Sequence, residues 1–305
     1  MSAFEALDLG LVVAAHGRHV VVETPEGQRV LCHPRGKKSE LVVGDRVRWL
    51  SLGEGAGAEG VIEHLEPRRN LLFRQDEWRS KSFAANLDLL LILVAGEPMF
   101  SESQLTRALI AAEQAGIPAC IGLNKIDLPA AASARERLAP YVAMGVEVVE
   151  LALKADPAAS RATLLPRLAG KTTLVLGPSG MGKSTLINLI VPAATAQVGE
   201  ISQALRAGRH TTTTTTWYWL DGERQGALID SPGFQEFGLR QIEPTQLAQL
   251  MPDFAARLGH CRFNNCTHRQ EPGCGVREAL ARGEIAETRY RIYGELFEEL
   301  SAKRW

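Results

Sequence analysis

The fold of this chain is decided by Gly177-Pro178-Ser179-Gly180-Met181-Gly182-Lys183-Ser184. This stretch matches the pattern G-x-x-x-x-G-K-S and stands between an apolar run, Thr173 to Leu176, and a helical pattern that begins at Lys183. A strand, a glycine-rich loop and a helix in this order predict a phosphate-binding loop, because the loop N–H groups and the helix N-terminus then face one anion. We therefore expect an α/β domain with a parallel sheet.

The residues of the loop have expected roles in binding a nucleotide. The glycines let the backbone wrap the β-phosphate, Lys183 neutralises phosphate charge, and Ser184 ligates Mg²⁺, with Thr185 next in the site. A second phosphate element is expected at Asp230-Ser231-Pro232-Gly233, which closes another apolar strand. There Asp230 would hold the magnesium through water, and the Gly233 N–H would sense the γ-phosphate.

A motif for base recognition comes earlier in the chain. Asn124-Lys125-Ile126-Asp127 follows the apolar run Ala119 to Leu123 and resembles the guanine-specificity motif of translation-factor-type GTPases. The Asp127 carboxylate accepts hydrogen bonds from guanine N1–H and the exocyclic amine, which adenine does not offer. Asn124 is expected to brace the base site, and Lys125 is expected to pack along the base.

The last guanine element is less well matched. Such proteins usually carry Ser-Ala-Lys, and the local match is Ala152-Leu153-Lys154, which follows a strand ending at Leu151. The serine is replaced by Ala152. Because this loop contributes mainly a backbone N–H to the guanine carbonyl, Leu153 remains a predicted nucleotide-binding residue.

The order of these motifs is inverted. In an ordinary GTPase the phosphate-binding loop precedes the Asn-Lys-x-Asp motif, whereas here residue 124 comes before residue 177. The sequence therefore predicts a circularly permuted GTPase domain over residues 86–243, with the conventional ends joined through residues 155–171. The chain leaves this domain soon after Gly233, so the γ-phosphate sensor is connected directly to the C-terminal region.

Short β-type runs separated by turn signals fill residues 1–67, for example Leu11-Val12-Val13. Five such runs fit a small oligonucleotide-binding (OB) barrel, and an SH3-like barrel is the alternative because strand number alone does not decide topology. Residues 68–85 are predicted to be a basic, irregular linker. Three of its arginines offer a stripe for phosphate groups: Arg68, Arg69 and Arg74.

A cluster of metal-ligating residue types marks the C-terminal region, residues 244–305. Its members are Cys261, Cys266, His268 and Cys274. Three thiolates and one imidazole suit a closed, tetrahedral structural zinc site. His260 is a competing ligand, and reduced, unliganded cysteines are the alternative. Because the surrounding pattern is helical and ends in the amphipathic run Ile285 to Leu300, we expect a helical zinc-binding domain.

Composition restricts the class of protein without naming a partner. The chain has 305 residues, 45% of them hydrophobic, with 34 basic and 35 acidic side chains. This balance predicts folded domains, and any nucleic acid must be met by a local basic patch. The longest apolar stretch, Leu87 to Ala95, is too short to span a bilayer, so we expect a cytosolic protein with no membrane partner. In a reducing compartment Cys32 and Cys120 are expected to be structural.

Together these features resemble the ribosome small subunit-dependent GTPase A family, which combines an N-terminal barrel, a permuted GTPase domain and a C-terminal zinc domain. The resemblance covers nearly the whole chain. Besides the motif order and the 177–184 loop, it is carried by Gly208-Arg209-His210-Thr211-Thr212-Thr213 and by Cys261-Arg262-Phe263 to Glu271-Pro272-Gly273-Cys274. The departures are Ala152 in place of serine and a threonine tract longer than the family's.

Membership in this family implies a cytoplasmic GTP hydrolase that assists late maturation of the 30S ribosomal subunit. It implies contact with 16S rRNA, GTP hydrolysis that is faster on the subunit, and release of other assembly factors. The expected cofactors are one structural Zn²⁺ and Mg²⁺ bound with GTP or GDP, and the chain is expected to be a monomer.

The catalytic water has no obvious positioning residue in this sequence. Phe234 follows Gly233 where many GTPases have glutamine, and Gln235 stands one position too far on. The water-positioning group is therefore predicted to be His210 or a group supplied by the ribosome, with Lys183 and Gly233 as the other catalytic residues. Thr212 or another threonine of residues 211–216 is expected to meet magnesium. Because no glutamine directly follows Gly233 to orient the attacking water, we expect slow GTP hydrolysis by the chain alone.

Two rival functions fit the same motifs. In the first, the chain is a stand-alone enzyme driven by a nucleoside triphosphate, whose barrel binds a small substrate and whose turnover is high without a partner. In the second, the chain is an RNA-binding module whose nucleotide site is only a structural switch, with negligible hydrolysis even on ribosomes. Turnover measured with and without 30S subunits separates the three functions.

Overall fold

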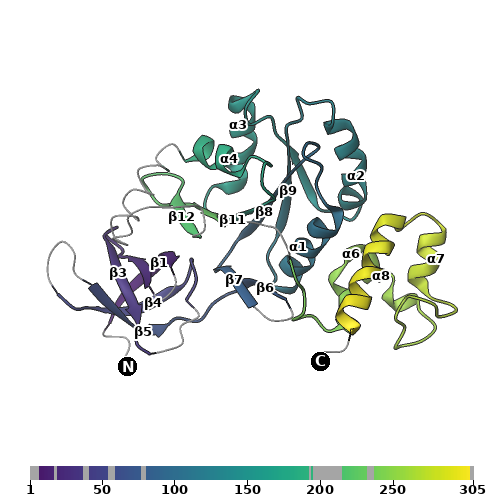
Figure 1. Cartoon of the computed structure of the whole chain (residues 1–305), viewed down its shortest axis with the longest axis horizontal. Coiled ribbons are helices and arrows are strands. Elements are labelled where there is room, and N and C mark those ends of the chain that lie inside the picture. The colour runs from purple at the N-terminus through teal and green to yellow at the C-terminus, as the bar shows by residue number, and fades with distance from the viewer. Residues whose placement is uncertain are drawn as a thin grey trace.

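The computed structural model of the chain contains a small barrel, a larger α/β domain and a C-terminal helical domain (Figure 1). The structure describes residues 7–16, 19–36, 41–53, 59–76, 80–191, 194, 215–231 and 237–302. This is the multidomain architecture that the sequence predicts. No helix within the described ranges is long and apolar enough to cross a bilayer.

The barrel consists of β1 (Asp8–His16), β2 (His19–Glu23), β3 (Arg29–Pro34), β4 (Arg46–Ser51) and β5 (Glu59–Leu65). The strands are ordered β1-β2-β3-β5-β4, and β4 pairs back with β1, so the barrel is closed. Strands β3 and β5 run parallel, and the other neighbours run antiparallel. This connectivity is that of an OB barrel, which removes the SH3-like alternative. The barrel is filled by apolar side chains, among them Val12, Val20, Val22, Val47 and Trp49.

The α/β domain is built on a mostly parallel sheet of order β10-β9-β8-β11-β13-β12. Its strands are β8 (Leu89–Ala95), β9 (Ala119–Asn124), β10 (Glu147–Glu150), β11 (Thr172–Leu176), β13 (Ala227–Asp230) and the antiparallel edge strand β12 (Thr216–Trp219). Its helices are α1 (Glu102–Gln114), α2 (Ala131–Ala143), α3 (Pro157–Leu168) and α4 (Lys183–Ile190). Figure 1 shows α1 and α2 on one side of the sheet and α3 and α4 on the other.

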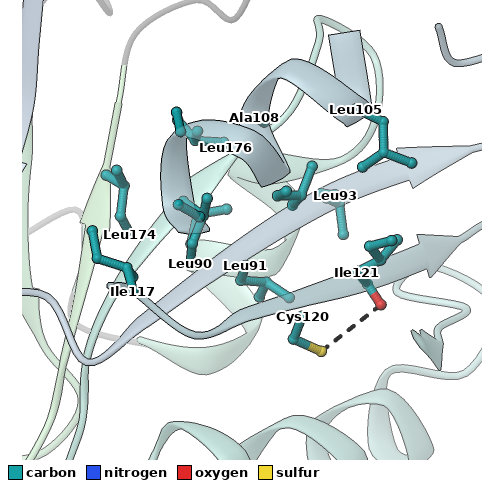
Figure 2. Packing of buried hydrophobic residues seen from close by; sticks show 14 of the residues in the cluster. Leu90, Leu91, Leu93, Leu105, Ala108, Ile117, Cys120, Ile121, Leu174 and Leu176 are labelled. Carbon is teal, nitrogen blue, oxygen red and sulfur yellow. Dashed lines mark hydrogen bonds between the residues drawn. The ribbon is translucent and has the colours of Figure 1, made fainter. Parts of the chain in front are cut away.

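Strand β8 lies in the middle of this core, between β9 and β11. All of its residues are buried, because helices cover the sheet on both faces and each strand side therefore meets apolar material. Figure 2 shows part of this core, where side chains of β8, β9, β11 and α1 gather. Burying each such leucine contributes about 1.5–3 kcal/mol, so this cluster anchors the domain that carries the loops described below.

Two elements differ from the sequence prediction. Residues 68–85, predicted to be an irregular linker, contain a hairpin of β6 (Leu71–Gln75) and β7 (Ser80–Ala85). The hairpin forms because Leu72 and Phe83 are buried, although charged residues surround them in the sequence. Strand β12 was not predicted either. It pairs with β13 and, through Thr216 opposite Ala14, with barrel strand β1, so one continuous sheet joins the two domains.

The C-terminal domain packs against α1. It contains the 3₁₀ helices η1 (Pro244–Leu250) and η2 (Leu258–His260) and the helices α6 (Pro252–Ala255), α7 (Gly275–Ala281) and α8 (Glu287–Ser301). Arg289 of α8 is 2% exposed, forms an ion pair with Asp253 and donates to Thr106 Oγ1 of α1 at 3.0 Å. A second ion pair joins Arg107 of α1 to Glu299 of α8. These contacts fix the C-terminal domain to helix α1 of the α/β domain.

Candidate functional site

The phosphate-binding loop lies at the carboxyl end of β11 and leads into α4, as the sequence predicts. Gly180 and Gly182 have φ angles of 82° and 104°, in the left-handed region that favours glycine. A Cβ on Gly177 would lie 2.5 Å from the Leu93 carbonyl oxygen, so a larger residue does not fit there. Lys183 Nζ donates to the carbonyls of Gly177 at 2.5 Å and of Pro178 at 3.3 Å. Its ammonium group is thus held against the loop.

Asn124 joins the three predicted nucleotide elements. Its side chain is buried, and its Nδ2 donates to the Met181 carbonyl of the phosphate-binding loop at 2.8 Å. Its Oδ1 accepts from the Leu153 N–H at 3.1 Å, in the third guanine element. Gly182 leaves the room for this arrangement, since a Cβ there would lie 2.5 Å from Asn124 Nδ2. The predicted bracing role of Asn124 therefore has a defined geometry.

These elements surround one cavity of about 750 Å³ at the carboxyl edge of the sheet. Ten of the predicted site residues line it: Asn124, Lys125, Asp127, Ser179, Gly180, Gly182, Lys183, Ser184, Thr185 and Asp230. Asp127 is exposed, and no described residue forms a hydrogen bond or ion pair with its carboxylate. Lys125 Nζ donates to the Glu97 carbonyl at 2.7 Å, which holds the lysine along the cavity wall.

Other predicted residues support the cavity without lining it. Gly177, Pro178 and Met181 act through their carbonyls, which accept from Lys183 and Asn124. Leu153 is buried, and its N–H is already given to Asn124. Lys154, the next residue, lines the cavity together with Leu128. The sequence pattern pointed to this loop, but the hydrogen bond from the Leu153 N–H to Asn124 could not be read from it. The nucleotide-binding role of Leu153 stays a prediction.

Lys183 and Asp230 are two oppositely charged, partly buried groups on this cavity. Burial lowers the pKa of Lys183, an effect that the Asp230 carboxylate opposes. Burial likewise raises the pKa of Asp230, and Lys183 opposes that shift. The two groups therefore stabilise each other's charge. The Ser184 hydroxyl and the Asp230 carboxylate are hard oxygen donors on one cavity, which is the donor set that Mg²⁺ prefers.

Five residues that the sequence assigned to the γ-phosphate and the water lie outside the described part of the chain. They are His210, Thr212, Gly233, Phe234 and Gln235. Their assignments stay predictions. The described neighbours on either side, Asp230 and Thr216, lie on the adjacent strands β13 and β12 and form a cross-strand pair.

Replacing Asn124 by alanine should weaken both the fold and nucleotide binding. The substitution leaves the Leu153 N–H and the Met181 carbonyl without their partner, and each unsatisfied buried group costs about 1–3 kcal/mol. We expect urea denaturation to report a loss of about 2 kcal/mol or more, with a matching fall in GDP affinity. The exposed Asn264 provides the control, since N264A should change neither quantity. Unchanged stability in N124A would contradict the bracing role.

A second constellation lies in the C-terminal domain. The ligand atoms of Cys261, Cys266, His268 and Cys274 all lie within 4.8 Å of one another. His268 Nδ1 is 3.5 Å from the sulfur of Cys261 and 3.5 Å from that of Cys274. Tetrahedral zinc with its usual bond lengths separates sulfur and nitrogen ligands by about 3.5 Å. The donor set and its spacing therefore fit one zinc ion.

The loop that carries these ligands is held by its own hydrogen bonds. Although burial alone raises the pKa of the Glu271 carboxyl, hydrogen bonds from the Thr267 hydroxyl and loop N–H groups lower it to about 2. Tyr290 donates to the His268 carbonyl at 2.7 Å and Tyr293 to the Thr267 carbonyl at 2.9 Å. The competing ligand His260 is exposed and is not part of the cluster.

Of the three arginines predicted to contact phosphate groups, Arg68, Arg69 and Arg74, not all present their side chains to solvent. Arg68 is 17% exposed and forms a bidentate ion pair with the buried Asp45, so it ties the hairpin segment to the barrel. Arg74 is 22% exposed. Arg69, 61% exposed and paired with Asp88, presents its side chain to solvent. The expectation of three phosphate-binding arginines is therefore corrected for Arg68, because a tertiary partner occupies it.

Sequence comparison places the chain beside known GTPases. The family model described as RsgA GTPase matches residues 65–240. The small ribosomal subunit biogenesis GTPase RsgA of Variovorax paradoxus is 62% identical over 301 residues, which cover 97% of this chain and 93% of that protein. The protein of the same name from Burkholderia pseudomallei is 56% identical over 295 residues, covering 96% and 92% of the two chains.

Solved structures agree with this placement. YjeQ from Thermotoga maritima superposes with a TM-score of 0.75 at 32% identity, covering 97% of this chain and 99% of that one. The structure of YloQ, described as a circularly permuted GTPase, superposes with a TM-score of 0.70 over 98% and 97% of the two chains. At 24% identity, the likeness to YloQ concerns the fold alone.

Proposed function

Because the chain belongs to the RsgA GTPase family and is a GTPase, we propose that it hydrolyses GTP as a late-stage assembly factor of the 30S ribosomal subunit. The curated relatives carry small ribosomal subunit biogenesis in their names. In this proposal the chain is a cytoplasmic monomer that binds 16S rRNA and releases other assembly factors. Its parts are an OB-like barrel (1–67), a basic linker that contains the β6–β7 hairpin (68–85), the permuted GTPase domain (86–243) and the zinc-binding domain (244–305).

One observation carries the proposal of GTP binding. The phosphate-binding loop and the Asn-Lys-x-Asp motif, which are reversed in chain order, line the same cavity and are joined through Asn124. In this site Asp127 would accept hydrogen bonds from the guanine edge, and the loop at Lys154 would face the guanine carbonyl. Lys183 and the loop N–H groups would hold the phosphates, while Ser184 and Asp230 would hold magnesium. Bound Mg²⁺ would neutralise charge that develops on the phosphate oxygens.

The zinc cluster has a structural role in this proposal. A closed set of three thiolates and one imidazole leaves no open position for a reacting group. The cluster instead fixes the loop between Cys261 and Cys274, which packs beneath α8 through Tyr290 and Tyr293. Because α8 is bound to α1 of the GTPase domain, the zinc-binding domain is positioned relative to the nucleotide site.

Hydrolysis by the isolated chain should be slow and should rise strongly with 30S subunits. The physical reason is that Phe234 stands where a water-positioning glutamine is common, so the partner has to complete the catalytic arrangement. GTP turnover measured against 30S concentration tests this, at two salt concentrations. Stimulation should weaken at high salt, because binding to rRNA releases counterions.

The substitution R69A should reduce the stimulation and leave basal turnover unchanged, since Arg69 is exposed and distant in the fold from the nucleotide cavity. The exposed Arg161 on α3 provides the matched control. Equal rates with and without 30S subunits would contradict the assembly-factor function. High turnover in both cases would then favour a stand-alone enzyme, and negligible turnover in both would favour a structural switch.

A further inference from the structure

A second cavity, of about 590 Å³, lies between the barrel and the GTPase domain. It shares no lining residue with the nucleotide cavity. Asp88, Thr172 and Ala227, at the amino ends of β8, β11 and β13, form its wall on the GTPase side, whereas the nucleotide cavity lies at the carboxyl ends of the same strands. The two cavities are therefore on opposite edges of the sheet. A cavity of this volume at a domain interface is of the size that binds small ligands.

The charge of this second cavity is positive. Two of its cations are already paired, Arg69 with Asp88 and Arg224 with Glu23. Arg46 of β4 and Lys171 before β11 also line the cavity and are exposed, and neither has an ion-pair partner among the described residues. Although burial alone raises the pKa of the Asp88 carboxyl, Lys171 lies close enough to help lower it. The four described cations of the lining nevertheless outnumber its two described carboxylates, so the cavity attracts an anion, and arginine with lysine is the common combination for phosphate.

The cavity also offers an aromatic wall. Trp219 of β12 lines it and is half-buried, and its ring contacts Trp217 edge-on with centroids 5.1 Å apart. The Trp219 indole is fixed in place because its Nε1 donates to the buried Glu23 of β2 at 2.7 Å. A rigid indole face beside a cationic rim is the usual surface for an unpaired base, since base–aromatic stacking contributes about 1–3 kcal/mol.

We infer that this cavity is a second nucleotide-binding site, in which an unpaired nucleotide places its base against Trp219 and its phosphate against Arg46 and Lys171. The same chemistry is presented by a free nucleotide and by an extruded nucleotide of single-stranded RNA. Only the RNA source rests on the proposed ribosomal function. Since the walls come from β1, β4 and β12, an occupant would contact the barrel and the GTPase edge strand together.

The test uses the full-length, zinc-loaded protein saturated with Mg²⁺ and GDP, so that the GTP site is filled. Tryptophan fluorescence and calorimetry follow titration with uridine and adenosine monophosphates in one arm and with a single-stranded hexaribonucleotide in the other. Binding in both arms identifies a site for free nucleotides. Binding of the hexaribonucleotide alone identifies a site for RNA. No binding in either arm overturns the inference.

Variants locate the binding in this cavity. The double variant R46Q/K171Q removes two phosphate contacts, so the slope of log affinity against log salt should become shallower by about 1.4 for the single strand. W219L should weaken binding roughly 5- to 150-fold, the range for loss of one base stack, whereas W219F should retain most of the affinity and lose most of the fluorescence change. The exposed Arg161 gives the control R161Q, with no change.

Basal GTP turnover should be unchanged in R46Q/K171Q, because these residues are not part of the nucleotide cavity. Binding that R46Q/K171Q and W219L leave untouched would place the ligand elsewhere and overturn the inference. A failure of 30S subunits to stimulate turnover would count against the proposed function but would leave this site standing. The two ideas can therefore fail separately.

Discussion

The substitution Asp127→Asn should convert the preference of the nucleotide site from GTP to xanthosine triphosphate. The Asp127 carboxylate accepts from two guanine N–H groups in the proposed site, and the amide of asparagine offers one acceptor and one donor group instead. Xanthine carries a carbonyl where guanine carries the amine, so the amide matches it. Sites built around such hydrogen bonds reject a mismatched ligand by about 10⁴-fold, and we expect GTP affinity to fall by about a thousandfold or more.

Competition between labelled GTP and xanthosine triphosphate measures this change. Asp127 is exposed and unbonded among the described side chains, so D127N should keep the parent's melting temperature. The exposed Glu136 on α2 provides a matched carboxylate, and E136Q should leave selectivity unaltered. If D127N still selects GTP over xanthosine triphosphate, guanine is recognised by other residues.

Loss of Cys266, a proposed zinc ligand, should unfold the C-terminal domain. Structural zinc of this kind supplies about 10–16 kcal/mol of apparent binding free energy, which is also folding free energy when the apo site does not persist. Metal analysis should give about one zinc per parent chain and almost none in Cys266→Ala. Hydrogen exchange should then show loss of protection over residues 244–302, while GDP binding at the distant cavity remains largely intact.

The histidine next to Cys261 distinguishes the ligand set from its alternative. His260 is exposed and outside the cluster, so H260A should retain its zinc and its protection. Chelation of zinc from the parent should reproduce the Cys266→Ala pattern. Stoichiometric zinc in Cys266→Ala would rule out the assignment, and zinc loss in H260A would show that the ligand set is different.

The gathering of the predicted nucleotide residues around one cavity, and of three cysteines and a histidine in one cluster, could be predicted because each depends on short, contiguous patterns. In each motif, the residues that form the site are close together in sequence, so the local conformation follows from the motif itself. This holds for the 177–184 loop, the Asn124 to Asp127 motif and the Cys261 to Cys274 spacing. The buried strands were also visible, since a parallel sheet covered on both faces needs continuous apolar runs such as Leu89 to Ala95. The reversed order of the motifs then predicted the permuted topology.

Features that depend on distant partners could not be predicted. Strand β12 is stabilised by pairing with β13 and with β1, about two hundred residues earlier, and a strand preference depends strongly on such context. The β6–β7 hairpin was not predicted, because the many charged residues in this segment favoured an irregular linker. The ion pair of Arg68 with Asp45 joins residues far apart in the chain, so sequence alone left Arg68 as an exposed phosphate ligand.

The position of β8 between β9 and β11 has a consequence for the nascent chain. Strands β8, β9 and β10 emerge from the ribosome one after another, but β11, the other neighbour of β8, begins at Thr172, after the whole of β10 and α3. At synthesis rates of about 5–20 residues per second, the edge of β8 stays unpaired for roughly 4 to 15 s.

Strand β8, Leu89 to Ala95, consists entirely of apolar residues, and an unpaired edge on such a strand is a template for aggregation. In an ordinary GTPase order, the strand of the phosphate-binding loop is made first and is ready when its neighbour appears. The permutation reverses this timing. Each newly made copy of this chain therefore passes through a period of several seconds, before β11 is made, in which one edge of β8 has no partner strand.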